Sequence, residues 1–164
     1  MPAPVLATAA IDAAALEALL DRFGVERIAV DAGRPIPGSY WGAPEAGLER
    51  NRLYLRPDTP VHSLLHELAH YVCMSGERRR SLVRDAGGDD DEEAAACYLQ
   101  VLLADALQGV GRARCFDDMD AWGYSFREGA ARAWFAGDGE DARRWLLAHD
   151  LIDAASRPTW RLRQ

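Results

Sequence analysis

Apolar and polar residues alternate along the N-terminal part of the chain in two different periods. Between residues 9 and 23 the apolar positions recur at helical spacing, and Gly24 follows as a stop signal. The segment 25–33 is shorter and rich in valine and isoleucine, which predicts a strand. Residues 52–57 alternate between polar and apolar side chains, as a half-buried strand does. The glycine- and proline-rich stretch between these two strands has room for one further short strand at 39–41.

The rest of the chain has the apolar periodicity of helices. Four are expected, at residues 58–76, 91–107, 117–135 and 140–152. In the first of these, Asp58 or Thr59 can cap the N-terminus, Pro60 fits the first turn, and Gly76 is a natural stop. The second begins with acidic residues, which suit the positive end of a helix dipole.

This order of elements predicts an α+β fold. The strands have no long crossover helices between them, so a short antiparallel or mixed sheet covered by helices is expected. A chain of 164 residues without a repeat or an evident linker is expected to form one domain, residues 1–164.

Composition narrows the classes of partner. A net charge of −7 argues against a nucleic acid or an anionic membrane, since both need a basic face. The basic stretch 77–84, "ERRRSLVR", is interpreted as a solvated loop after a helix. The chain has three cysteines without metal-type spacing, which favours free thiols in a reducing compartment. The N-terminal stretch has neither the basic region of a signal peptide nor the apolar length of a membrane span, so a cytoplasmic location is expected.

The stretch "HSLLHELAHYV" carries the chemistry. His66 and His70 are four residues apart, so on a helix they face a common point, where two neutral imidazoles suit a zinc ion. Glu67 is rotated by about 100° and can reach a water molecule at that point as a general base. This is the H-E-x-x-H pattern of zinc metallopeptidases. The alternative is that the three are ordinary core or surface residues, but their apolar flanks predict a buried helix whose polar side chains need partners.

A catalytic zinc ion needs a third protein ligand. His62 lies too far along the helix to share the ion, and Cys73 is better explained as a core residue. The next helix offers two glutamates, of which Glu93 lies at the edge of the apolar face near Gln100. Glu92 lies in the middle of that face, with Ala95, Ala96, Leu99, Leu102, Leu103 and Ala106.

Glu92 is therefore the expected ligand, because a charge in the middle of a buried face needs an explanation. The small alanines 94–96 would let the two helices approach closely enough for one ion to bridge them. The alternative is that Asp89 caps the helix and Glu92 belongs to a capping box, which leaves Glu93 as the ligand.

Together these segments resemble the ImmA/IrrE-like metallopeptidases, small cytoplasmic gluzincins. The likeness covers residues 38–107, from "GSYWG" through "NRLYLR" and the H-E-x-x-H helix to "EEAAACYLQVLL". In this comparison Glu92 falls on the family's zinc-ligand glutamate, and Ala95, Tyr98 and Leu102–Leu103 fall on its alanine, aromatic residue and leucine pair.

The chain departs from that family at several positions. Ala96 replaces an asparagine, Leu99 replaces a second alanine, Ala69 replaces the glycine between the histidines, and no Met-Pro follows the leucines. The resemblance implies a zincin-like domain in which the strand at 39–41 borders the cleft. An extended peptide would pair with its edge, and Tyr40 and Trp41 would line the rim unless they serve ordinary packing.

The sequence thus predicts a zinc-dependent metallopeptidase that acts on a peptide or protein substrate. His66, His70 and Glu92 would bind Zn²⁺, and Glu67 would be the general base and then the acid to the leaving amine. Tyr124 or His149 would donate to the oxyanion, although each also has an ordinary structural explanation. The alternative function is a catalytically silent zinc-binding module that regulates a partner protein by binding it. A purely structural zinc domain is disfavoured, because it gains nothing from Glu67.

Overall fold

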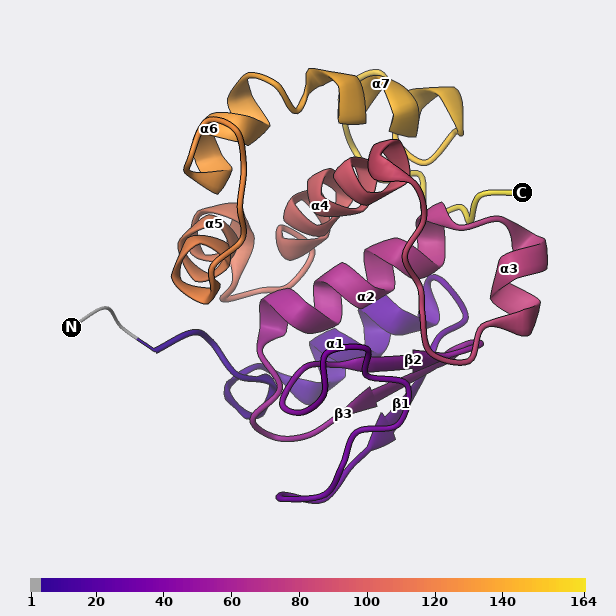
Figure 1. Cartoon of the computed structure of the whole chain (residues 1–164), viewed down its shortest axis with the longest axis vertical. Helices are drawn as coiled ribbons and strands as arrows, with labels where there is room; N and C mark the ends of the chain where they lie inside the picture. The colour runs from indigo at the N-terminus through magenta and orange to yellow at the C-terminus, as the bar shows by residue number, and fades with distance from the viewer. Residues whose placement is uncertain (1–3) are drawn as a thin grey trace.

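A three-stranded mixed sheet forms one side of the molecule in the computed structural model, which describes residues 4–164 (Figure 1). Its strands are β1 (Glu26–Ala29), β2 (Gly47–Glu49) and β3 (Arg52–Leu55), in the order β1-β3-β2. β1 runs parallel to the central strand β3, and β2 runs antiparallel to it. The expected α+β class with a small mixed sheet is confirmed.

The third strand does not lie where the sequence predicted it. Residues 39–41 form no strand, and β2 follows them instead. The preceding loop lies against β2 so closely that a Cβ atom on Gly47 would come within 1.8 Å of the Pro37 carbonyl oxygen. The Leu48 amide also donates to the Gly38 carbonyl at 3.5 Å. The chain's own loop therefore occupies part of the edge at which an extended peptide was expected to pair.

Helices make up most of the remaining structure. They are α1 (Ala13–Asp21), α2 (Val61–Cys73), α3 (Gly76–Ser81), α4 (Asp90–Ala104), α5 (Gly111–Trp122), α6 (Ala131–Ala136) and α7 (Glu140–Ala148). A short 3-10 turn, Thr8–Ala10, precedes α1. Asp12 is the N-cap of α1, and its side chain accepts from the Ala14 amide. The single helix predicted at 117–135 is wrong: α5 begins earlier and ends at Gly123, whose φ of 101° turns the chain away before α6.

The ends of α2 also differ from the prediction. Pro60 is the N-cap residue itself, and neither neighbour caps the helix with its side chain. Asp58 pairs with Arg56, and the Thr59 hydroxyl accepts from the Arg56 amide, so both brace the turn before the helix. Gly76 is not the stop, because it opens α3.

α2 lies between the sheet and α4, and α5 and α7 pack on α4 (Figure 1). Both central helices are therefore buried over most of their length. Their fully buried side chains include Leu64, Leu65, Leu68, Leu99 and Leu103. Most polar groups that these two helices carry toward each other are shielded from bulk water, whereas Glu93, in the first turn of α4, is 48% exposed.

The basic stretch 77–84 is not a solvated loop, since most of it belongs to α3. Arg79 is buried and donates to the carbonyl oxygens of Tyr71, Met74 and Arg163. It thereby fastens the C-terminal residues to the end of α2, and Trp160 packs against Phe23.

The state of the cysteines and the length of the apolar helices bear on the environment of the chain. Cys73, Cys97 and Cys115 are all free and buried, as the odd number predicted. Among residues 4–164, no helix is both long enough and apolar enough to cross a lipid bilayer.

Candidate metal centre

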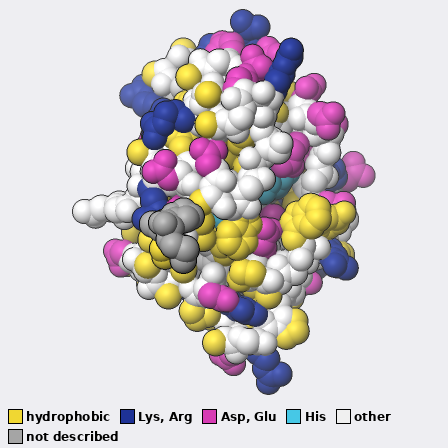
Figure 2. All heavy atoms as spheres, turned by 60° about the vertical axis from the view of Figure 1, so that its left-hand side comes forward, with side chains coloured by type: hydrophobic (Ala, Val, Ile, Leu, Met, Phe, Trp, Pro, Cys, Tyr) yellow, Lys and Arg dark blue, Asp and Glu magenta, His cyan; other side chains and the backbone are white. Residues whose placement is uncertain are grey.

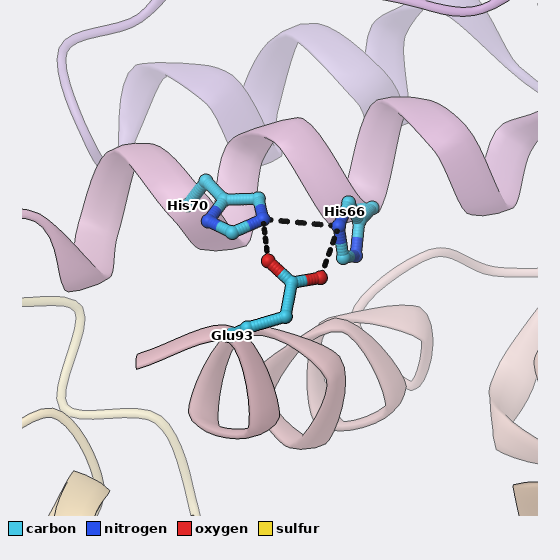
Figure 3. A group of neighbouring side chains, drawn as sticks. All are labelled: His66, His70 and Glu93. Atoms are coloured by element: carbon cyan, nitrogen blue, oxygen red, sulfur yellow. Dashed lines mark hydrogen bonds and ion pairs between the residues drawn. The ribbon is translucent and has the colours of Figure 1, made fainter. Parts of the chain in front are cut away.

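His66, His70 and Glu93 meet between the two central helices (Figure 3). The Nε2 atoms of the two histidines are 3.0 Å apart. One carboxylate oxygen of Glu93 lies 3.2 Å from the His66 Nε2, and the other lies 2.8 Å from the His70 Nε2. α2 supplies both imidazoles, as their i, i+4 spacing predicted, and the first turn of α4 supplies the carboxylate.

This group fits a zinc ion. Two imidazole nitrogens and a carboxylate are a common zinc donor set, and tetrahedral bonds of about 2.0–2.2 Å place neighbouring donors about 3.3 Å apart. The two Nε2 atoms are 3.0 Å apart, each lies 2.8–3.2 Å from one Glu93 oxygen, and one donor atom from each of the three residues lies within 4.8 Å of the others, so modest movements of these side chains would admit the ion. Burial raises the pKa of Glu93, but hydrogen bonds from His66 and His70 lower it more, and the net direction is downward. Glu93 is therefore ionised, as a ligand must be.

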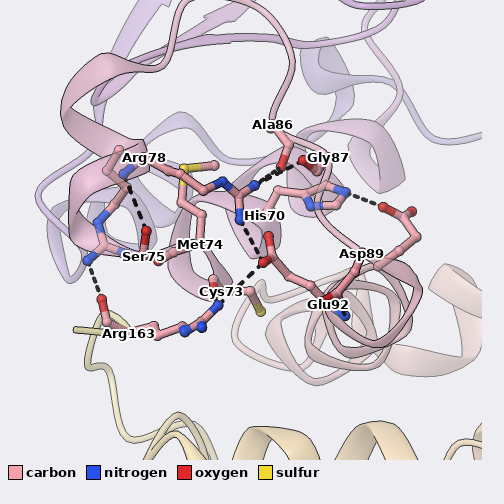
Figure 4. A network of polar contacts seen from close by, with 12 residues as sticks. His70, Cys73, Met74, Ser75, Arg78, Ala86, Gly87, Asp89, Glu92 and Arg163 are labelled. Atoms are coloured by element: carbon pink, nitrogen blue, oxygen red, sulfur yellow. Dashed lines mark hydrogen bonds and ion pairs between the residues drawn. The ribbon is translucent and has the colours of Figure 1, made fainter.

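The expectation that Glu92 faces the histidines is wrong. Its buried carboxylate points the other way and accepts from Arg78 at 2.7 Å and from Arg163 at 3.4 Å (Figure 4). Asp89 is the N-cap and accepts from the Glu92 amide at 2.9 Å, as the alternative interpretation held. Because adjacent helical residues point about 100° apart, this arrangement turns Glu93 toward α2.

Gly88 shows how tightly the Glu92 carboxylate is enclosed. A Cβ atom at this position would lie 2.4 Å from the carboxyl carbon of Glu92, so only glycine lets the loop pass over it. The Glu92 carboxylate in the middle of the apolar face is thus explained without a metal ion, because two arginines pair with it and Gly88 leaves room for it.

Gln100 is a site residue that the sequence analysis did not identify. It is fully buried on α4, and its Oε1 lies 2.9 Å from the Nδ1 of His66. Its Nε2 lies 2.8 Å from the backbone carbonyl of His62 and 3.3 Å from the Tyr124 hydroxyl. The available signal was its spacing: Gln100 is seven residues after Glu93, which places both on one face of a helix.

These contacts determine where the His66 proton lies. The His62 carbonyl can only accept, so the amide group facing it must be the Nε2 donor of Gln100. Oε1 therefore faces His66 and can only accept, which places a proton on the His66 Nδ1. Without a metal ion, the His66 Nε2 faces the Glu93 carboxylate and donates to it. Burial lowers the pKa of His66, but its polar neighbours outweigh this and raise the pKa well above its usual value. A zinc ion would displace the Nε2 proton and meet the lone pair of that nitrogen. His70 lacks such support, because its Nδ1 is buried without a partner.

The Tyr124 hydroxyl, the expected donor to the oxyanion, contacts both Gln100 and His62. His62 is buried rather than near solvent, and its Nδ1 is 3.1 Å from the Tyr124 hydroxyl. Burial, with a smaller effect of His66, lowers the pKa of His62 to about 3, so this imidazole is neutral. Its Nε2 is buried without a hydrogen-bond partner. Burying an unprotonated nitrogen there costs less free energy than burying an N–H group that has no acceptor. The proton is thus assigned to Nδ1, which donates to Tyr124.

The Tyr124 oxygen then accepts from both His62 and Gln100, so its own proton must point elsewhere. Tyr124 lines the open cleft beside the histidines, and this is the direction left to its hydroxyl. Burial also raises the pKa of Tyr124 to about 12, which keeps the proton on it. His149, the other proposed donor, lies elsewhere: it stacks on Trp145 at the end of α7.

A cleft of about 820 Å³ opens above the metal-ligand group. Figure 2 shows histidine atoms in this hollow, with hydrophobic and acidic side chains around them. Its lining residues are Tyr40, Trp41, Glu45, His66, Glu67, His70, Asp85, Ala86, Gly87, Gly88, Glu93, Trp122, Gly123 and Tyr124. Glu67 thus shares the cleft with the histidines, and burial raises its pKa although His66 and His70 oppose this.

No protein-family model matches the chain, and neither a curated protein nor a solved structure matches it. The chemistry of the site is therefore inferred from its own side chains.

The two adjacent glutamates should behave in opposite ways. Glu93→Ala removes a ligand and should weaken Zn²⁺ binding at least about a hundredfold, because three protein ligands define such a site. Glu92→Ala should leave Zn²⁺ affinity nearly unchanged and destabilise the fold by about 1–3 kcal/mol, because two partly exposed arginines lose their partner. Zinc titration and thermal unfolding of both variants test this. The reverse pattern would show that α4 is rotated by one residue relative to the structure.

Gln100→Leu should release the His66 imidazole. We expect the Nδ1 of His66 to stay protonated in the wild-type protein, because Gln100 Oε1 accepts from it, and to lose this proton more readily in the variant, as ¹⁵N NMR of the imidazole can measure. Zn²⁺ affinity should fall about ten- to a hundredfold, the usual effect of losing the group that orients a ligand. Ser63→Ala is the matched control, because it removes a buried hydrogen bond to the Ala46 amide from the same helix. Unchanged tautomers and affinity in Gln100→Leu would refute the assignment.

Proposed function

We propose that this protein is a zinc-dependent metallopeptidase of the gluzincin type. His66, His70 and Glu93 would hold the ion, and Glu67 would be the general base. The observation that carries the proposal is the convergence of two imidazole Nε2 atoms and a carboxylate at the floor of an open cleft that also contains Glu67. A purely structural zinc site would not need the Glu67 carboxylate beside the ion.

Zinc supplies Lewis acidity and makes a coordinated water molecule easier to deprotonate. Glu67 would take the proton from that water and later deliver it to the leaving amine of the cleaved peptide bond. Its raised pKa suits a group that must both accept and return a proton near neutral pH. Tyr124 would direct its hydroxyl at the oxygen on which negative charge develops.

The resemblance to the ImmA/IrrE-like metallopeptidases supports the same proposal once the ligand is moved by one position. An alanine stands three residues after either glutamate, Ala95 after Glu92 and Ala96 after Glu93. The alanine therefore fits both alignments, although the leucine pair fits only the first. The short distances from Glu93 to both histidines favour it as the third ligand in this proposal.

The protein should contain one tightly bound zinc ion per chain. Elemental analysis after purification without added metal should give close to one equivalent, and removal by a chelator should lower the melting temperature, since the ion binds only the folded chain. Absence of zinc together with failure to take it up on titration would exclude a zinc-dependent activity.

Glu67→Gln should keep zinc and lose cleavage. The amide has nearly the same size but cannot accept the proton from water, so the rate should fall at least about a hundredfold. The assay is incubation of the zinc-loaded protein with a library of unfolded proteins, followed by sequencing of new termini. Glu128→Gln, an exposed substitution outside the cleft, is the control. A zinc-loaded wild-type protein that generates no new termini would favour the alternative, a silent module that binds a partner protein.

A further inference from the structure

The largest exposed apolar side chains gather around the cleft. Among the described residues, four large hydrophobic side chains are exposed, and three of them are the aromatic residues Tyr40, Trp41 and Trp122. All three line the cleft, and Trp41 is 79% exposed. Such a concentration of exposed apolar surface marks an interaction site rather than chance exposure.

The aromatic rings are held in place. Tyr40 and Trp41 pack edge to face, with ring centroids 5.0 Å apart. On another part of the lining, the Trp122 indole N–H donates to Glu45 at 2.8 Å, and its ring packs against His62. The Trp122 ring, which is anchored to Glu45 and His62, can bind a ligand at a small cost in conformational entropy.

The charge of the lining has one sign. Four carboxylates belong to it, Glu45, Glu67, Asp85 and Glu93, and no arginine or lysine does. They outnumber the two positive charges of a zinc ion, so the cleft stays negative with the metal bound. The chain as a whole has a net charge of −7, which extends this negative potential beyond the cleft.

The nearest basic residues do not reverse this sign. Arg78 lies behind the cleft wall, where it donates to the carbonyls of Ala86 and Gly87 and pairs with the buried Glu92. Arg84 is exposed and reaches the Tyr40 carbonyl, but its side chain does not line the cleft.

We infer that the cleft selects peptide segments with lysine or arginine side chains on either side of the bond that enters the metal centre. This inference rests on the proposed function. Carboxylates on the lining would attract the cationic groups, and the faces of Trp41 and Trp122 would bind them through cation–π contacts. Acidic segments would meet four carboxylates, with the zinc ion as the one opposite charge, and no arginine or lysine on the lining.

Binding can be measured separately from cleavage with the zinc-loaded Glu67→Gln variant. Three peptides of equal length would share an apolar centre and carry lysines, glutamines or glutamates on both sides. Fluorescence anisotropy at low salt should show the lysine peptide binding at least about tenfold more tightly than the glutamate peptide, and this ratio should shrink at high salt. Equal affinities, or no binding of any peptide, would overturn the inference, whether or not the wild-type protein cleaves proteins.

Substitutions of acidic residues inside and outside the cleft test which carboxylates cause the preference for the lysine peptide. Glu45→Gln and Asp85→Asn, made separately, should each reduce the preference for the lysine peptide, whereas Asp141→Asn, which removes one charge from an exposed acid on α7, should leave it unchanged. Trp41→Ala should weaken the lysine peptide about threefold more than the glutamine peptide. Equal effects of the cleft and α7 substitutions would mean that the net charge, and not the cleft, attracts the peptide.

The contact can also be mapped directly. None of the 19 basic residues of the chain is a lysine, so a carbodiimide cannot join its side chains to one another through amide bonds. With the lysine peptide present, coupling should therefore attach the peptide's amines to carboxylates of the protein. We expect mass spectrometry to find the attachment at Glu45 and Asp85. Attachment spread evenly over the surface acids would contradict a defined cleft site.

Discussion

The packing of α2 against α4 is the constraint on which the site depends. Both helices are buried over most of their length, so most polar groups that they turn toward one another find partners within the pair or on residues packed against it. Glu93 and Gln100, two turns apart on α4, meet His70 and His66 on α2. A line of hydrogen-bonding groups thus runs along the helix interface, with the cleft on one side of its metal-facing end and buried apolar side chains around the rest. Movement of either helix by one turn would leave several of these groups unpaired at once.

The first turn of α4 shows how one acidic segment serves three purposes. Asp89 caps the helix, Glu92 binds the arginines of α3 and the C-terminal segment, and Glu93 faces the histidines. Helix geometry keeps the last two apart, because successive side chains differ by about 100° in direction. The C-terminal residues therefore contribute to the position of α4 through Arg163, although they do not line the cleft.

Much of this structure was accessible from the sequence, and the errors have physical causes. The H-E-x-x-H spacing alone places His66 and His70 on one face, so that prediction needed no tertiary information. The choice between Glu92 and Glu93 did need it: the apolar face of α4 is broad, and the arginines that neutralise Glu92 come from distant segments. The strand expected at 39–41 failed for a similar reason, because β2 is selected by pairing with β3 and not by its own three residues.

Gln100 could have been identified from its place on the helix face. A polar residue in the buried part of a helix must be satisfied, and its position two turns from Glu93 already indicates the direction in which its partner lies. The glutamine also connects His66 to Tyr124, whose ring lies beside that of His66. The orientation of the His66 imidazole and that of the Tyr124 hydroxyl are thereby linked to a single amide, whose own direction is fixed by a backbone carbonyl of α2. Because a carbonyl cannot change from acceptor to donor, the backbone of the helix itself determines the proton positions around the site.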